Sequence, residues 1–325
     1  MFSSTAGPPR GGTGRCGSGY REQTYWLRYQ EFFPGSLRVG EDDAPDEQWW
    51  PWRGTHVHLD RLARPAAPVT VLALHGIGGY GRMLAPFGKL PALADAEFLA
   101  PDLPGSGLTP GPPGEPLTYR TWVDCVLELV HRERARDGRP VVLLGFSAGG
   151  RLAYDVAALA GPQVSAVVAT CLVDPRSARV RRSLAARPEQ VPWSGVLGLL
   201  PRSVRVPMHW MVNIAAVSNH TQFANLVWAD PLGGARGITP GFARSCVTAD
   251  PVVAPESFRA APLLLAAPAE DRWTPVPLSR AFFDRLPAGA RYAALSGAGH
   301  LPVEESGLAD LDRAVRDFFD ENGLG

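Results

Sequence analysis

The segment that most constrains how this chain can fold is residues 140–150, Pro-Val-Val-Leu-Leu-Gly-Phe-Ser-Ala-Gly-Gly. Its β-prone apolar run, residues 141–144, predicts a central parallel strand that is covered on both faces. Residues 151–160 predict a helix, which Gly161-Pro162 ends. We therefore expect a strand, a sharp turn and a helix, with Ser147 at the tip of the turn. Gly145 and Gly149 are expected because a side chain would collide where the strand and the helix approach each other.

Composition limits the class of protein. With 325 residues, of which 45% are hydrophobic, the chain can bury a large core, as one α/β domain or as a domain with an insertion. The formal net charge of +0 gives no field that would favour nucleic acid or an acidic membrane surface. Lys89 is the single lysine among 32 basic residues, and Ala, Gly, Pro and Arg are abundant, which indicates a GC-rich, bacterial gene.

Cysteine usage and the amino-terminal segment bear on location. The four cysteines are scattered, with no Cys-x-x-Cys pair or His-rich stretch, so we expect reduced thiols, a cytoplasmic protein and no metal site. Residues 1–19 are rich in Gly, Ser and Pro without an apolar core, which predicts a disordered leader and not a secretion signal. The longest near-apolar run, residues 164–173, is far shorter than the ~20 residues that span a bilayer.

Hydrophobic patterning predicts strands alternating with helices on both sides of Ser147, which is typical of a mostly parallel, doubly wound sheet of the α/β class. Upstream, residues 23–39 and 52–63 predict antiparallel strands at one edge, and the aromatic residues 48–52 are expected to cover that edge. The expected central strands are residues 69–74, 98–100, 141–144, 164–172, 262–267 and 291–295; the expected helices are residues 83–94, 119–136, 151–160, 276–286 and 307–319.

The alternation stops between Asp174 and Pro255, where we expect a helical insertion over the carboxyl edge of the sheet. The predicted domains are then a leader (1–19), a core (20–173 and 256–325) and a cap (174–255). Most apolar residues of the cap are expected to pack on the core. Four of them are candidates to line a pocket for an apolar substrate: Trp193, Met208, Met211 and Trp228.

A glycine-rich segment, His75-Gly76-Ile77-Gly78-Gly79, follows the first central strand. It does not fit the Gly-x-Gly-x-x-Gly fingerprint, and no acidic residue stands at the right distance, so no dinucleotide cofactor is predicted, nor any other. Its backbone N–H groups are instead expected to approach an anionic oxygen. His75 is predicted to shape this loop and is a further candidate for the substrate pocket.

Three residues at strand ends form a candidate catalytic set. A serine hydroxyl needs a base to take its proton, and that base needs an acid to fix its tautomer. Ser147, Asp271 and His300 follow three strands of the same sheet, in that chain order. Glu270 and Asp174 remain alternatives for the acid. Taken singly, the three could be a turn serine, a helix cap and a loop histidine.

These motifs resemble the α/β-hydrolase superfamily, and within it serine hydrolases related to monoacylglycerol lipases, lysophospholipases and proline-iminopeptidase-like enzymes. The resemblance covers about residues 69–319. It implies Ser147 as nucleophile, His300 as general base and acid, and Asp271 as the residue that orients His300. It also implies an oxyanion hole made by the backbone N–H groups of Ile77 and Ala148. Asp102 and Arg151 are expected to hold loops together through hydrogen bonds.

The resulting hypothesis is a hydrolase of lipophilic carboxylic esters that forms an acyl-Ser147 intermediate. In one alternative, the same triad serves a biosynthetic thioesterase, cyclase or acyltransferase. In another, the protein has the hydrolase fold but binds a ligand without turnover. A proline-directed aminopeptidase would need an acidic cluster in the cap to hold the substrate amine, and the insertion has few carboxylates, chiefly Glu189, Asp230, Asp250 and Glu256. The expected partner is a small lipophilic ester or thioester, with no nucleic acid and no integral membrane segment; the oligomeric state stays open.

Overall fold

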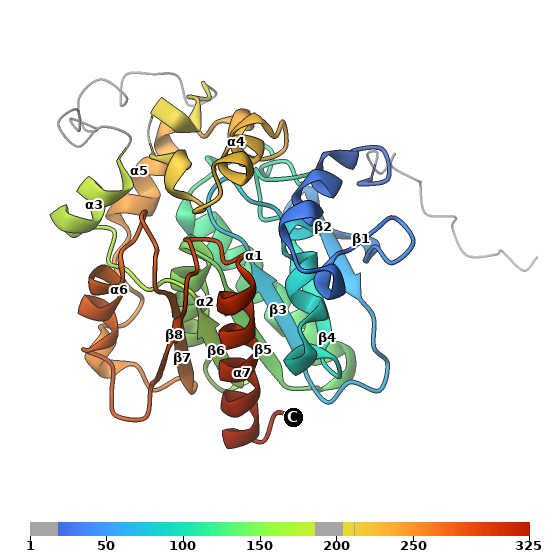
Figure 1. Cartoon of the computed structure of the whole chain (residues 1–325), viewed down its shortest axis with the longest axis vertical. Coiled ribbons are helices and arrows are strands. Elements are labelled where there is room, and N and C mark those ends of the chain that lie inside the picture. The colour runs from blue at the N-terminus through green and yellow to red at the C-terminus, as the bar shows by residue number, and fades with distance from the viewer. Residues whose placement is uncertain (1–18, 186–203, 211) are drawn as a thin grey trace, which may run out of the picture.

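The computed structural model describes residues 19–185, 204–210 and 212–325, and within them eight strands form one sheet. Their order across the sheet is β1-β2-β4-β3-β5-β6-β7-β8 (Figure 1). β1 and β2 pair antiparallel, β2 also runs antiparallel to β4, and all other neighbours are parallel. The strands are β1 (Asp46–Trp52), β2 (Thr55–Leu62), β3 (Thr70–Leu74), β4 (Glu97–Pro101), β5 (Val141–Gly145), β6 (Ala166–Ala169), β7 (Leu263–Pro268) and β8 (Arg291–Leu295).

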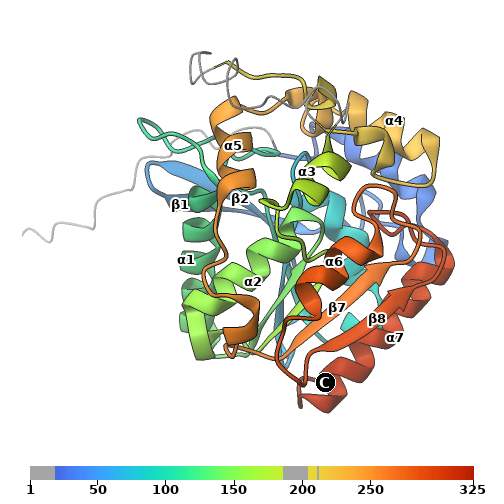
Figure 2. The same ribbon diagram turned by 90° about the vertical axis from the view of Figure 1, so that its left-hand side faces the viewer.

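Helices cover both faces of this sheet, which confirms the predicted doubly wound α/β architecture. Figure 2 shows α1, α2 and α6 on one face, while α7 lies on the other. The α-helices are α1 (Tyr119–Asp137), α2 (Ala148–Ala160), α3 (Ala178–Leu184), α4 (Thr221–Ala229), α5 (Pro240–Thr248), α6 (Val276–Phe283) and α7 (Glu305–Glu321). The 3-10 helices are η1 (Thr24–Phe32), η2 (Gly35–Leu37), η3 (Gly81–Lys89), η4 (Pro91–Leu93), η5 (Gly161–Gln163), η8 (Met208–Trp210), η9 (Ile214–Ala216), η10 (Gly234–Arg236) and η11 (Pro255–Ser257).

The central strands are apolar throughout because each feeds two cores. Successive side chains of a strand point to opposite faces. In β3, Val71 and Ala73 belong to the core under η3 and α7, whereas Leu72 and Leu74 belong to the core under α1 and α2. The unbroken apolar run of β5 has the same origin, so the strand that leads to Ser147 is anchored from both sides.

Two elements differ from the sequence prediction. Residues 24–32 form the 3-10 helix η1 and not an edge strand, because Trp26, Tyr29 and Phe33 are buried at helical spacing. The predicted helix over residues 83–94 is the pair of 3-10 helices η3 and η4, since Pro86 lies inside η3 and Pro91 begins η4. The predicted antiparallel strand over residues 52–63 is confirmed as β2, and the whole aromatic segment 48–52 belongs to β1, which is the edge strand.

Between β6 and β7 the chain forms α3, α4 and α5, which lie together at one end of the sheet (Figure 1). The amino-terminal helix η1 packs on α4: the Tyr25 hydroxyl donates to the carbonyl of Leu226 at 3.0 Å, and the Tyr29 hydroxyl donates to Asp230 at 2.7 Å. This end of the molecule is therefore built from segments about 200 residues apart. Residues 1–18 of the predicted leader lie outside the described residues.

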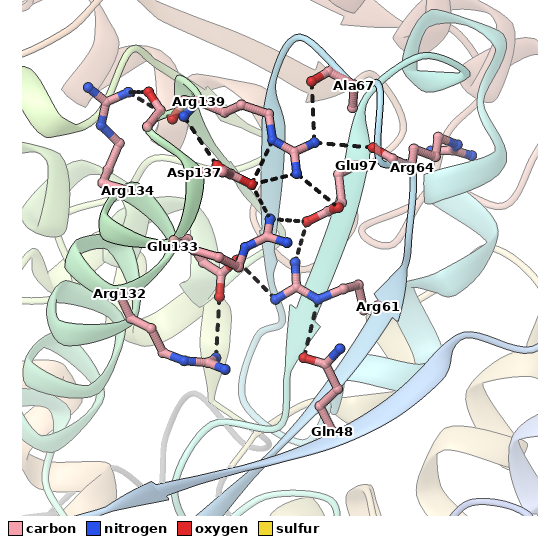
Figure 3. A network of polar contacts seen from close by, with 12 residues as sticks. Gln48, Arg61, Arg64, Ala67, Glu97, Arg132, Glu133, Arg134, Asp137 and Arg139 are labelled. Carbon is pink, nitrogen blue, oxygen red and sulfur yellow. Dashed lines mark hydrogen bonds and ion pairs between the residues drawn. The ribbon is translucent and has the colours of Figure 1, made fainter.

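A buried network of ion pairs joins β2, β4 and α1 (Figure 3). Arg61 binds both Glu97 and, at 2.9 Å, Glu133, and all three side chains are almost fully buried. Arg136 and Arg139 add further pairs to Glu97. Glu97 begins β4, so the network lies at the amino ends of the parallel strands, opposite Ser147 at the carboxyl ends. We assign it a structural role, because a buried charge is stable only when it is paired.

A second buried cluster surrounds His58 on β2. Its Nε2 lies 2.9 Å from Glu47, and its Nδ1 lies 3.4 Å from Asp102. Burial disfavours a charge on the ring, but Asp102, Glu47 and Asp60 outweigh it and raise the pKa of His58 to about 10. A histidine in the unfolded chain has a pKa of about 6.5. Protonated His58 therefore stabilises the fold fully below about pH 6.5, and this contribution is lost as the pH rises toward 10.

We expect the free energy of unfolding to fall more steeply between pH 6.5 and pH 9.5 in the wild type than in His58→Gln. One pKa unit corresponds to about 1.4 kcal/mol, so over this pH interval the wild type should lose more than about 1.4 kcal/mol of unfolding free energy beyond what His58→Gln loses. Urea unfolding at both pH values measures it. His56→Gln is the matched control, because His56 lies exposed on the same strand. Parallel pH profiles for wild type and His58→Gln would contradict a charged His58.

Candidate active site

The turn between β5 and α2 places Ser147 at the carboxyl edge of the sheet. Ser147 has φ 55° and ψ −125°, a conformation that a residue with a side chain rarely adopts. The neighbouring backbones make this turn possible: a Cβ on Gly145 would lie 2.2 Å from the carbonyl oxygen of Gly149, and one on Gly149 would lie 2.1 Å from that of Leu74. The prediction that only glycine fits at both positions is confirmed.

The structure brings Ser147, His300 and Asp271 into one chain of hydrogen bonds. His300 Nε2 lies 2.6 Å from Ser147 Oγ, and His300 Nδ1 lies 2.8 Å from Asp271 Oδ2. The carboxylate accepts from Nδ1–H, which leaves the lone pair of Nε2 free to accept the serine proton. His300 and Asp271 are buried, and the three residues come from segments 124 and 29 residues apart in the chain.

Asp271 is held by more than His300. Its Oδ1 accepts the backbone N–H groups of Trp273 (2.7 Å) and Thr274 (2.8 Å), and its Oδ2 accepts the Thr274 hydroxyl at 2.7 Å. Burial on its own raises the pKa of Asp271, but the charge of His300 and the hydrogen bonds from His300 and Thr274 outweigh burial and lower it. The carboxylate is therefore ionised at neutral pH, and it also caps the local turn.

The two alternative acids lie elsewhere. Asp174 pairs with Arg176 at 2.8 Å, and the Glu270 side chain is exposed to solvent. Sequence reasoning missed Thr274, whose hydroxyl contacts both Asp271 and, at 3.1 Å, His300 Nδ1. Its spacing of three residues from Asp271 is the signal that would have revealed it, because a side chain at that distance can close a turn on a carboxylate.

The loop after β3 can approach Ser147 closely because Gly76 has no side chain. A Cβ at this position would lie 2.8 Å from the Ser147 Cβ. Among the hydrogen bonds of the described residues, the backbone N–H groups of Ile77 and Ala148 have no acceptor. Ala148 is the first residue of α2, so its N–H is one of those that a helix leaves unpaired at its positive end. Both residues line the same cavity as Ser147.

His75 is engaged on both ring nitrogens. Its Nδ1–H donates to the Gly76 carbonyl at 2.7 Å, and its Nε2 accepts the Leu103 N–H at 3.0 Å. The ring is therefore neutral, and burial lowers its pKa. This arrangement supports the expected role of His75 in shaping the loop. Asp102, as expected, also joins loops: it accepts the backbone N–H groups of Gly81 and Leu108.

A cavity of about 100 Å³ lies beside Ser147. It is bordered by the turn, by α1 and by the segment between β6 and β7. Met208 lines it, as predicted. The residues along its wall are Ile77, Tyr119, Ser147, Ala148, Arg151, Cys171, Val173, Pro175, Leu184, Met208, Val212, Cys246, Val247, Ala249, Trp273 and Thr274. The wall is mostly apolar, with Arg151 as its one basic residue in the described part of the chain.

None of the other described pocket candidates lines this cavity. Trp228 does not line the cavity: its side chain is on the outside of α4, 46% exposed, and its indole N–H donates to His209 at 3.2 Å. His75 borders a smaller cavity, which Ser147 and His300 also line, together with Met83 and Leu301. Trp193 and Met211 lie outside the described residues.

In residues 19–185, 204–210 and 212–325 no group of three or more His, Cys, Asp or Glu side chains is placed to hold a metal ion. In the same ranges no helix combines the length and the apolar character needed to cross a bilayer.

Comparison with known proteins bears on the whole core. A model of the "Alpha/beta hydrolase family" matches residues 71–314. Lipase LipV of Mycobacterium tuberculosis is 34% identical over 119 residues, which span 37% of this chain and 41% of that protein, so less than half of the relative is covered.

Solved structures of similar shape are more distant in sequence. A monoglyceride lipase from Saccharomyces cerevisiae superposes with a TM-score of 0.70 at 15% identity, covering 89% of this chain and 98% of its own. A monoacylglycerol lipase from Paleococcus ferrophilus gives 0.61 at 19% identity, with 82% and 99% covered. A putative aryl esterase from Burkholderia cenocepacia gives 0.59 at 18%, with 86% and 100% covered. At these identities the likeness establishes the fold alone.

Proposed function

Because the chain belongs to the alpha/beta hydrolase family, we propose that it is a serine hydrolase that cleaves a carboxylic ester of a lipophilic small molecule. The observation that carries this proposal is the unbroken chain of hydrogen bonds from Ser147 through His300 to Asp271. It ends at an apolar cavity, where an ester could reach Ser147 Oγ.

The proposed reaction begins when Ser147 Oγ attacks the ester carbonyl carbon and its proton passes to His300 Nε2. The negative charge that develops on the carbonyl oxygen is stabilised by the N–H groups of Ile77 and Ala148. When the tetrahedral intermediate collapses, the C–O bond to the alcohol breaks and His300 returns the proton to the leaving oxygen. Water, deprotonated by His300, then attacks the acyl-Ser147 ester and releases the carboxylic acid.

Asp271 fixes His300 in the tautomer that this sequence needs. Its Oδ2 accepts Nδ1–H, and its negative charge stabilises the imidazolium that forms when Nε2 is protonated. The Thr274 hydroxyl donates to the same carboxylate oxygen, which helps to hold it in place beside the ring.

The apolar cavity wall supports a lipophilic substrate, because the transfer of apolar groups from water into such a cavity makes the free energy of binding more favourable. Relatives named as lipases and esterases agree with an ester bond. A thioesterase would use the same residues and differs in the leaving group, which is a thiol, whereas an acyltransferase differs in the acceptor of the acyl group. Free thiols at Cys125, Cys171 and Cys246 support a cytoplasmic location.

The aminopeptidase alternative is less well supported, because the acidic residues of the cap are already engaged. Asp230 is buried and accepts the hydroxyls of Tyr29 and Tyr80, each at 2.7 Å. Asp250 pairs with Arg176, and Glu256 pairs with Arg285. Asp230 is thus occupied within the protein, and Asp250 and Glu256 form exposed ion pairs that are not part of the cavity wall beside Ser147. Glu189 lies outside the described residues.

We expect p-nitrophenyl esters graded by acyl length to be hydrolysed, with kcat/KM rising with chain length until the acyl chain fills the cavity. Each buried CH₂ contributes about 0.8 kcal/mol, which is roughly a fourfold gain. Prolyl p-nitroanilide should not be cleaved. Cleavage of the anilide without cleavage of any ester would contradict the proposed esterase and support an aminopeptidase instead.

A further inference from the structure

Arg151 is the one charged residue that lines the cavity in the described part of the chain, and the proposed reaction gives it no role. It lies on α2, four residues after Ser147, so the two side chains share one face of the helix, about 6 Å apart along its axis. Side chains of a helix tilt toward its amino terminus, which here is the end that carries Ser147. Both residues line the same cavity.

The hydrogen bonds of Arg151 use only one edge of its guanidinium. Its Nε donates to Asp155 at 2.9 Å, whereas Nη1 and Nη2 are buried and have no acceptor among the described residues. The residue is only 5% exposed. The ring of Phe282 lies 5.7 Å from Cζ, against the face of the group, and does not satisfy these N–H donors. Buried donors without partners are uncommon in folded proteins, and a ligand is one reason for them.

Asp155 anchors the arginine and does not compete for its free edge. The carboxylate also accepts the Tyr119 hydroxyl and the backbone N–H of Val252, each at 2.9 Å. Its remaining interactions are therefore within the protein. The sequence predicts that Arg151 holds a loop, but its Nε donates to Asp155 on the same helix, and the contact to the loop at Val252 is made by Asp155. That prediction also does not account for Nη1 and Nη2.

We propose that Nη1 and Nη2 of Arg151 bind a carboxylate on the substrate, so that the preferred ester carries an acidic group at a distance from the bond that is cleaved. A planar guanidinium matches a carboxylate with two parallel hydrogen bonds. The apolar wall between Arg151 and Ser147 then holds the hydrocarbon chain that joins the acid to the ester. This inference rests on the proposed esterase activity, and it makes Arg151 a determinant of specificity.

The test compares p-nitrophenyl monoesters of succinate, glutarate and adipate with p-nitrophenyl esters of the same length that end in a methyl group. A second series places the acid in the alcohol, as butyrate esters of hydroxy acids, which distinguishes the two sides of the ester. In the wild type at least one acidic ester should exceed its methyl partner by about 10- to 100-fold in kcat/KM. Arg151→Met should abolish this ratio, and Arg151→Lys should reduce it, since lysine lacks the fork.

Controls separate this inference from the catalytic one. Arg179→Met removes an exposed arginine of α3 that is not part of the cavity wall, and should keep the ratio. If Arg151→Met does not fold, the wild-type ratio still decides: a ratio near one in both series overturns the proposal. Binding is tested without turnover in Ser147→Ala, where monomethyl glutarate should raise Tm unless Arg151→Met is added. No Tm shift there would overturn the inference even if esters are cleaved, whereas a shift without ester cleavage would overturn only the esterase proposal.

Discussion

Replacing Ser147 by alanine is expected to lower kcat for ester hydrolysis by about 10⁶-fold, the loss typical of removing the nucleophile of a serine triad. The change deletes the Oγ that lies 2.6 Å from His300 Nε2 and leaves every backbone contact of the turn in place. Alanine meets the same strain at φ 55° as serine, so the fold should persist. Steady-state kinetics with a p-nitrophenyl ester, together with a thermal melt, measures both effects.

Ser177→Ala is the matched control. Ser177 precedes α3 and makes no capping hydrogen bond with its side chain, so its loss should change neither activity nor Tm. If Ser147→Ala kept activity within about tenfold of the wild type, the hydrolysis would not proceed through this serine.

Asp271→Asn is expected to lower kcat by about 10⁴-fold while KM changes little. The amide cannot meet all four donors that the carboxylate now accepts. If its NH₂ faces His300, the ring must turn to the other tautomer, and Nε2–H can no longer accept the serine proton. If its NH₂ faces the backbone, it meets the N–H groups of Trp273 and Thr274, and the turn loses two hydrogen bonds.

Two neighbouring acids provide the comparison. Asp174→Asn and Glu270→Gln change carboxylates that do not touch His300, so both should keep nearly full activity. A loss in Asp174→Asn equal to that expected for Asp271→Asn would transfer the orienting role to Asp174.

Because the pKa of Asp271 is lowered in the folded chain, its contribution to stability is present above its unfolded pKa of about 3.9. It is lost as the pH falls through the lower folded value, and Asp271→Asn should weaken this acid sensitivity.

The features that the sequence predicted well are those that local chemistry determines. The strand before Ser147 is an unbroken apolar run, and the glycines around it have no room for a side chain, so both features are visible without tertiary information. The same holds for the positions of Asp271 and His300 at strand ends. Parallel strands bring their carboxyl ends to one edge, which is why residues far apart in the chain could be expected to lie together.

The features that it missed depend on contacts between distant segments. Tyr29 and its aromatic neighbours look β-prone, yet η1 is a 3-10 helix because it packs on α4, where Tyr29 meets Asp230. Trp228 could not be assigned to a face of α4 from composition, since the placement of that helix decides which face is covered. The free edge of Arg151 was equally invisible, because an unpaired donor is recognised only when every possible partner has been located.

The measurement that tests the central claim most directly is labelling with a fluorophosphonate, followed by digestion and mass spectrometry of the peptides. A fluorophosphonate forms a stable ester only with a serine whose proton is taken by a nearby base. We expect one adduct, on Ser147, with loss of esterase activity in proportion to labelling, and none in Ser147→Ala. A protein that hydrolyses esters but carries no adduct, or carries it on another serine, would contradict the proposed mechanism.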